Sequence, residues 1–203
     1  MVALHFDWFG YSFQTGLGVL RSSMLAARDA LSANVEIAQE EAVGYQERVR
    51  AGVEEAQIDY DDAGYVILDH QDILNWNVQV AEDAEMALRK AFVLAVYHHW
   101  ERSARKWTES AHGKHDALEK LTLTKGYPID PKLGAVRDLV NLLKHANSVW
   151  AKRLMSSWPA VFYPDVQPLP LLDWYEAVNL TDPIVDEIFE IISKSGPVST
   201  LAD

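Results

Sequence analysis

The amino-acid sequence predicts an all-α protein, an antiparallel helical bundle built on two long helices with shorter satellite helices. Three observations support this prediction: an apolar stripe at helical spacing within residues 20–51, an apolar run inside residues 78–108, and later segments with typical helix-boundary residues. No internal repeat or linker interrupts the 203 residues, so we expect a single domain over 1–203.

The first long helix is expected from about Leu20 to about Ala51. Apolar residues recur there at spacings of three and four, which places them on one face: Leu31, Val35, Ala38, Ala42, Tyr45 and Val49. Gly52 is a typical residue to end a helix, because glycine adopts the left-handed cap conformation without steric cost. Residues 53–75 are acidic and irregular, and Gly64–Leu68 is expected to be a short extended piece.

The second long helix is expected from about Val78 to Thr108. Its segment Ala91–Tyr97 is apolar on all sides, which indicates a central position. Shorter helices are expected at about 114–124, 132–146 and 148–157, and a last one after Thr181-Asp182-Pro183. Asp130 and Pro131 have the chemistry of an N-cap and a first helical residue, so we expect them to open the second short helix. The proline-rich residues 162–172 are expected to form a connector.

The composition is that of a soluble globular protein, with 49% hydrophobic and 24% charged residues. The chain has no cysteine, which excludes disulfides, thiolate metal sites and thiol nucleophiles and fits a reducing cytoplasm. Residues 1–13 contain no Lys or Arg, so they do not form a secretory signal. No apolar stretch approaches the roughly 20 residues that span a bilayer, so no membrane partner is expected.

Charge is distributed unevenly along the chain. The net charge of −12 divides into −12 for residues 1–88, +7 for 89–153 and −7 for 154–203. The basic central region also holds five of the seven histidines, His98, His99, His112, His115 and His145. Such asymmetry is consistent with a surface that faces an anion, or with acidic helices that cover basic ones within one fold.

A first group of polar residues shares a face of the second long helix. His98, Glu101 and Arg105 follow Leu94 at spacings of four, three and four. They are candidate binding residues, in which the histidine transfers protons and the glutamate holds a basic group. The alternative is a solvated face on which Glu101 and Arg105 form a surface pair that contributes about 0.3–0.5 kcal/mol.

A second group lies in residues 133–148. Arg137, Asn141, Lys144 and Ser148 line one stripe at spacings of four, three and four, and His145 borders it. Together they are suited to binding a phosphate, with charge from lysine, hydrogen bonds from asparagine and serine, and proton transfer by histidine. The alternative is a helix junction, in which Asn147 or Ser148 caps the next helix and Lys144 and His145 complement the preceding C-terminus.

No metal and no cofactor are expected from the motifs. His98-x-x-Glu101 and His112-x-x-His115-Asp116 each offer two ligands at helical spacing, but the paired Glu-x-x-His motifs of a bundle di-metal site are missing. The zinc motif His-Glu-x-x-His, the glycine-rich phosphate loops and the Gly-x-Ser-x-Gly nucleophile motif are also missing from the sequence.

Two motifs together resemble those of bacterial helical proteins related to the HEPN superfamily, named for higher eukaryotes and prokaryotes nucleotide-binding. The motifs are Tyr97-His98-His99-Trp100-Glu101-Arg102 on a central helix, and Asn141-Leu142-Leu143-Lys144-His145-Ala146-Asn147 before a helix that ends near Pro159-Ala160-Val161-Phe162. The resemblance covers roughly residues 78–193. It implies an antiparallel helical bundle, often dimeric, in which active members cleave RNA with an Arg and a His on one helix, at a cleft between protomers.

Two hypotheses follow for the function. In the first, the chain binds or cleaves RNA, as a metal-independent endoribonuclease of a bacterial defence or toxin–antitoxin system. Here His145, Asn141 and Lys144 are catalytic, Arg137 helps to bind the phosphate, and the partners are a second copy, an RNA or nucleotide and an operon-encoded protein. In the second, the chain is a non-enzymatic interaction protein whose polar motif residues form a structural network and whose 20–51 stripe is a dimer seam.

Overall fold

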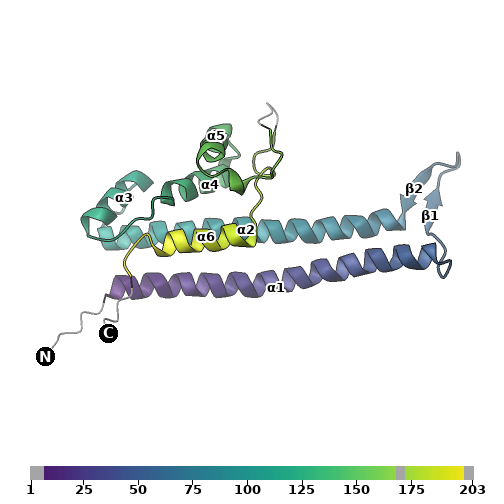
Figure 1. The fold of residues 1–203 in the computed structure, drawn as a ribbon, viewed down its shortest axis with the longest axis horizontal. Coiled ribbons are helices and arrows are strands. Elements are labelled where there is room, and N and C mark those ends of the chain that lie inside the picture. The colour runs from purple at the N-terminus through teal and green to yellow at the C-terminus, as the bar shows by residue number, and fades with distance from the viewer. Residues whose placement is uncertain (1–6, 168–171, 199–203) are drawn as a thin grey trace. The chain divides into compact units, whose positions relative to one another are not determined.

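The structure of the protein is a computed structural model that describes residues 7–167 and 172–198. Figure 1 shows a mostly helical fold, which confirms the all-α prediction. In chain order the elements are α1 (Trp8–Arg50), β1 (Ile58–Tyr60), β2 (Val66–Asp69), α2 (His70–Thr108), α3 (His115–Thr124), α4 (Leu133–His145), α5 (Ser148–Ser157), the 3-10 turn η1 (Pro159–Val161) and α6 (Asp182–Ser193). In the part of the chain that is described, no helix carries an apolar stretch sufficient to cross a bilayer.

The chain divides into two compact units. Unit 1 combines Met1–Met24 with Arg89–Asp203, and unit 2 is Leu25–Leu88. Both long helices contribute to both units. No sequence feature indicates this division, because helical periodicity continues through each long helix without a turn signal.

Unit 2 is a helical hairpin closed by a small antiparallel sheet. The second half of α1 pairs with the first half of α2 in opposite directions, since Ser32 bonds to Glu85, Gln39 to Glu82, and Gln71 to the carbonyl of Ala42. Its core contains Ala42, Tyr45 and Leu74, with Val49 and Val78 packed against them. Three residues of the apolar stripe that was considered as a dimer seam are therefore covered by this chain's own α2.

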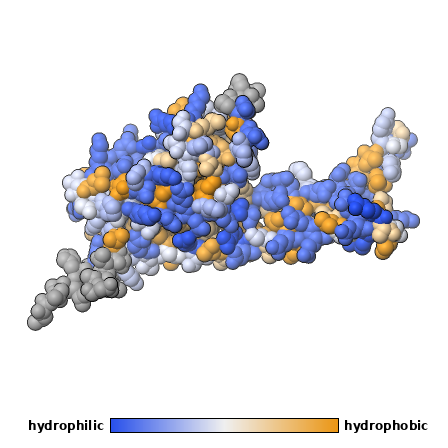
Figure 2. Space-filling model, viewed as in Figure 1, coloured by the Kyte–Doolittle hydropathy of each residue, from blue (hydrophilic) through white to orange (hydrophobic). Residues whose placement is uncertain are grey.

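The two strands form a hairpin of antiparallel β1 and β2. Ile58 pairs with Asp69, and the register shifts between Asp59 and Tyr60. The expected extended piece at Gly64–Leu68 corresponds to β2. The hairpin exposes five large side chains: Tyr60, Tyr65, Val66, Ile67 and Leu68. Figure 2 shows orange, hydrophobic atoms over this part of the molecule.

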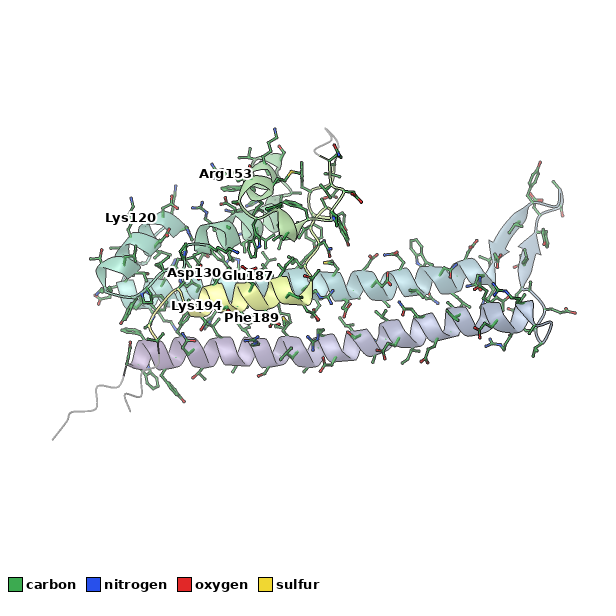
Figure 3. The ribbon with its side chains drawn as sticks, viewed as in Figure 1. Lys120, Asp130, Arg153, Glu187, Phe189 and Lys194 are labelled. Carbon is green, nitrogen blue, oxygen red and sulfur yellow. The ribbon has the colours of Figure 1, made fainter. Side chains whose placement is uncertain are left out.

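Unit 1 is built around the second half of α2. Val96, Trp100 and Ala104 are completely buried, and Leu139 of α4 and Ile188 of α6 are buried with no exposed surface. Helix α6 is bound to α1 by Gln14, which bonds to Ser193, and by the Arg21–Asp186 ion pair. It is bound to the start of α4 by the Lys132–Glu187 ion pair, next to Asp130 in Figure 3.

Several helix starts differ from the predicted ones. Helix α1 begins at Trp8 and not at Leu20, because the Asp7 carboxylate accepts hydrogen bonds from the backbone N–H groups of Phe9 and Gly10 at 2.9 and 3.1 Å. Helix α2 likewise begins at His70 and not at Val78, since Asp69 Oδ1 accepts from the Gln71 N–H at 2.9 Å.

The predicted opening of α4 was wrong by two residues. Lys132 is the N-cap, and Asp130 instead closes the preceding turn by accepting from the Lys132 N–H at 2.8 Å. The expected start of α5 is confirmed, and Asn147 caps this helix through the Val149 N–H. Helix α6 begins at Asp182, which is two residues earlier than the expected start after Pro183. Residues 168–171 of the predicted connector lie outside the described residues.

Candidate functional site

A cleft of about 440 Å³ lies in unit 1, between the end of α2, the loop before α3, and α4. Six of the eight predicted site residues line it: His98, Glu101, Arg105, Arg137, Asn141 and Lys144. The remaining lining residues are Tyr97, His112, Gly113, Lys114, His115 and Val140. The two polar stripes that the sequence placed on separate helices therefore face a common space.

Glu101 organises the α2 wall of the cleft. Its Oε2 lies 3.0 Å from His98 Nδ1, and its Oε1 lies 3.7 Å from Arg105 Nη2. The Glu101 side chain is 17% exposed and the His98 side chain is 42% exposed, so the carboxylate is the fixed partner. A carboxylate that accepts from Nδ1–H leaves the His98 Nε2 atom to face solvent or a ligand.

Arg137 connects the α4 wall to α3. Its guanidinium forms ion pairs with Asp116, and with Asp138 at 3.0 Å, while its side chain is 23% exposed. Two carboxylates thus offset the Arg137 charge. This residue therefore holds α3 against α4 and offers a ligand less net charge than an unpaired arginine does.

Lys114 and Lys144 offer a ligand the most available charge in the cleft. Both are exposed. Within residues 7–167 and 172–198 neither ammonium forms an ion pair or a hydrogen bond, so all three donors of each are free for an anion. Asn141 is half-buried between the two polar walls, and its side-chain amide is also without a hydrogen bond to any described residue.

A buried Tyr97–His115 pair forms the floor beside these charges. The Tyr97 hydroxyl lies 2.8 Å from His115 Nδ1. Burial raises the pKa of Tyr97 well above its ordinary value, with a smaller contribution from Glu101. Burial also lowers the pKa of His115 to about 4, and Arg137 adds to this. Both side chains are therefore neutral near pH 7.

Tyr97, His112, Lys114 and His115 were missed as cleft residues. The helical period placed Tyr97 on the apolar stripe, where it is indeed buried. His112 and Lys114 lie in the loop before α3, and no spacing rule folds a loop back onto a helix. The only signal was the clustering of histidines in the basic central region.

His145 and Ser148 do not line the cleft. The cleft lining on α4 ends at Lys144, and His145, the last residue of the helix, is exposed. Ala146 then adopts a left-handed conformation with φ of 45°. Ser148 consequently belongs to the next helix, α5. The predicted stripe assumed that one helical register continues from Arg137 to Ser148, and for this reason it placed Ser148 wrongly.

One group of donor atoms among the described residues has the compactness of a metal site. Ligand atoms of His115, Asp116 and Glu119 all lie within 4.8 Å of one another at the start of α3. The motif analysis had considered His115 and Asp116 only together with His112.

A second cavity, of about 250 Å³, lies in unit 1 beside His99. The His99 ring stacks on Phe13 with centroids 5.5 Å apart, and its Nε2–H donates to the Phe13 carbonyl at 3.0 Å. Burial lowers the pKa of His99, and the nearby Arg102 and Lys106 lower it further, although the bond to Phe13 acts in the opposite direction.

We expect His99 to make the fold less stable in mild acid. Because its folded-state pKa is below the ordinary value of about 6.5, its contribution is complete above that pH and is lost as the pH falls through the folded-state value. Urea unfolding of wild type and His99→Gln, near neutrality and in mild acid, measures how much of the free energy of unfolding each protein loses on acidification. Wild type should lose more stability on acidification than the variant; equal losses would contradict the assignment. His115 acts in the same direction in both proteins and cancels in the comparison.

Comparison of the chain with family profiles, with curated proteins and with solved structures gave no match.

Proposed function

We propose that the protein binds RNA through the cleft between α2 and α4. The observation that carries the proposal is that Lys114 and Lys144, whose ammonium groups have no partner among the described residues, lie on a cleft that also contains Arg105 and Arg137. The cleft volume of about 440 Å³ is in the range of small-ligand sites and suits a nucleotide-sized segment. The charge of +7 over residues 89–153 provides attraction for a polyanion despite the acidic total.

In this proposal, different polar side chains of the cleft bind different parts of the RNA. Lys114 and Lys144 bind phosphate oxygens as point charges, and Arg105 adds a planar donor beside Glu101. The unpaired Asn141 amide can both donate and accept, which suits a base edge or a ribose hydroxyl. This part of the proposal keeps Arg137 and Arg105 as binding residues, and it assigns binding roles to Asn141 and Lys144, which the sequence analysis placed among the catalytic residues.

RNA cleavage, which the HEPN resemblance implies, requires an acid–base group inside the cleft. His98 has this position and His145 does not, so we assign the role to His98 with Glu101 as its orienting partner. His98 Nε2 takes the proton of a 2′-hydroxyl, whose oxygen bonds to the adjacent phosphorus while the 5′-oxygen leaves. The products are a 2′,3′-cyclic phosphate and, once the leaving oxygen takes a proton from water, a 5′-hydroxyl. A role in bacterial defence beside an operon-encoded partner extends the same proposal.

One observation favours the alternative of a non-enzymatic interaction protein. Arg137 is paired with Asp116 and Asp138, so its charge already serves the packing of α3 on α4. Asn141 argues the other way, because its side chain has no hydrogen bond within the described residues and does not belong to such a network.

We expect Lys114→Ala/Lys144→Ala to weaken RNA binding by at least tenfold. Each lost phosphate contact reduces the slope of log affinity against log salt by about 0.7 for single strands, so the double variant should lose about 1.4. Fluorescence anisotropy with labelled single-stranded RNA and with tRNA measures both quantities. The control Lys120→Ala/Lys152→Ala removes the same charge from exposed positions on α3 and α5 that do not line the cleft (Lys120 is labelled in Figure 3).

Equal affinity losses in the two double variants would overturn the proposal, since binding would then depend on net charge alone.

The same mixtures, analysed by gel for cyclic-phosphate ends in the presence of chelator, test cleavage. His98→Gln should abolish the products and His145→Gln should not. Products that persist in His98→Gln at the wild-type rate would remove His98 from the mechanism and leave the binding proposal to the anisotropy result.

A further inference from the structure

We infer that His115, Asp116 and Glu119 bind a divalent transition-metal ion of the Zn²⁺ class at the start of α3, next to the cleft whose floor His115 helps to form. The three residues form the sequence His-Asp-x-x-Glu at the start of α3. His115 and Glu119 are four residues apart and therefore lie one above the other on the same helix face. The facing atoms, His115 Nε2 and Glu119 Oε2, are 3.6 Å apart.

The His115 Nε2 atom is buried and has no hydrogen-bond partner. The side chain is 6% exposed, and Nε2 is the one buried side-chain nitrogen or oxygen among the described residues that lacks a partner. Buried polar atoms are almost always paired, because leaving one unsatisfied is unfavourable. The distance of 3.6 Å to Glu119 is too long for a hydrogen bond. A metal ion between the two atoms would satisfy both.

The neighbours of His115 are those of a typical metal-binding histidine. Ligating histidines usually donate their second ring N–H to a neighbouring oxygen, which fixes the ring and its tautomer. Tyr97 supplies such an oxygen at 2.8 Å from Nδ1: in the tautomer that carries the proton on Nδ1, this N–H donates to the Tyr97 hydroxyl and the Nε2 lone pair is free for a metal ion.

The surroundings of the two carboxylates, Asp116 and Glu119, are also suited to binding a metal ion. Asp116 is held through Oδ1 by Arg137, which orients the carboxylate and leaves its other oxygen available. Glu119 is half-buried, and its Oε2 lies 3.6 Å from the Nε2 atom of the neutral His115 ring. Arg137 would thus hold the Asp116 ligand in place and connect the ion to α4.

The distance between the His115 and Glu119 ligand atoms fits a small tetrahedral ion. With bonds of about 2.0–2.1 Å to nitrogen and oxygen, two ligand atoms of tetrahedral Zn²⁺ are separated by roughly 3.3 Å, close to the Nε2–Oε2 distance. A nitrogen ligand with two carboxylates favours Zn²⁺ or Co²⁺ over Mg²⁺, which prefers oxygen ligands alone. Three protein ligands leave one position for an exchangeable water molecule.

Titration of the full chain with Zn²⁺ by calorimetry, and with Co²⁺ by visible absorption, tests the site. We expect one ion per chain, with a Co²⁺ spectrum of tetrahedral intensity. Glu119→Gln and Asp116→Asn should each weaken the affinity by at least tenfold. Both replaced side chains are partly or fully exposed, so these variants should fold, which circular dichroism checks.

Two controls locate the ion. Glu190→Gln also removes one glutamate of an i,i+4 pair on a short helix, and it should bind as wild type does. His98→Gln removes the neighbouring histidine–glutamate pair and should likewise retain affinity. No saturable binding at submillimolar Zn²⁺, or full affinity in Glu119→Gln, overturns the inference, and neither result bears on the RNA assay performed with chelator.

Discussion

Replacing Trp100 by alanine is expected to lower the free energy of unfolding by about 3–5 kcal/mol. Trp100 lies on α2 in the centre of unit 1 and is completely buried. The substitution removes a large apolar side chain and leaves a cavity. It also leaves the buried Ser195 carbonyl without the indole N–H that donates to it at 2.5 Å, which adds the cost of an unsatisfied acceptor.

The comparison with Trp76→Ala makes this expectation specific. Trp76 lies on the same helix but is 68% exposed, so its replacement should change stability by no more than about 0.5 kcal/mol. Guanidinium denaturation followed by circular dichroism measures both variants. Similar losses in the two would mean that α2 is stabilised by helix propensity and not by the core of unit 1.

Trp100 also supports the candidate sites. Its ring centroid lies 5.9 Å from that of Tyr97 and 5.3 Å from that of His115, so the core tryptophan packs directly against the floor of the cleft. The sequence placed Trp100 and Tyr97 on one apolar stripe, and burial bears this out. It could not place His115 against them, because that contact depends on how the loop before α3 returns to α2.

Local chemistry explains which parts of the fold were predictable. Helices α5 and α6 begin where capping and proline signals lie next to the first helical residue, as at Asn147 and Pro183. The start of α1 was missed although Asp7 is a good N-cap, because the aromatic residues after it do not show a clear stripe. Tertiary contacts stabilise the N-terminal part of α1, as in the hydrogen bond between the Gln14 and Ser193 side chains.

The candidate site was predictable where it depends on one helix at a time. Spacing alone put His98, Glu101 and Arg105 on a shared face, and Arg137, Asn141 and Lys144 on another. Spacing could not show that the two faces meet. It also failed across Ala146, where the chain changes direction and the register of α4 is lost.

Gly16→Ala and Gly18→Ala should change stability in opposite directions, although both replace a glycine inside α1. A methyl group at Gly16 would lie 2.3 Å from His99 Cε1 and 2.8 Å from Nε2. The ring cannot move aside freely, because it is stacked on Phe13 and bonded to the Phe13 carbonyl. Overpacking of this kind costs about 1–3 kcal/mol, more than the helix gains from alanine.

At Gly18 an added methyl group meets no atom within 4 Å, and the residue is exposed. Alanine is the better helix former by about 0.5–1 kcal/mol, so Gly18→Ala should raise the denaturation midpoint while Gly16→Ala lowers it. The two substitutions are two residues apart and chemically identical, so propensity and unfolded-state effects nearly cancel between them. A destabilisation of Gly16→Ala therefore measures the close approach of α1 to His99. A gain in both variants would show that the approach is looser than these contacts require.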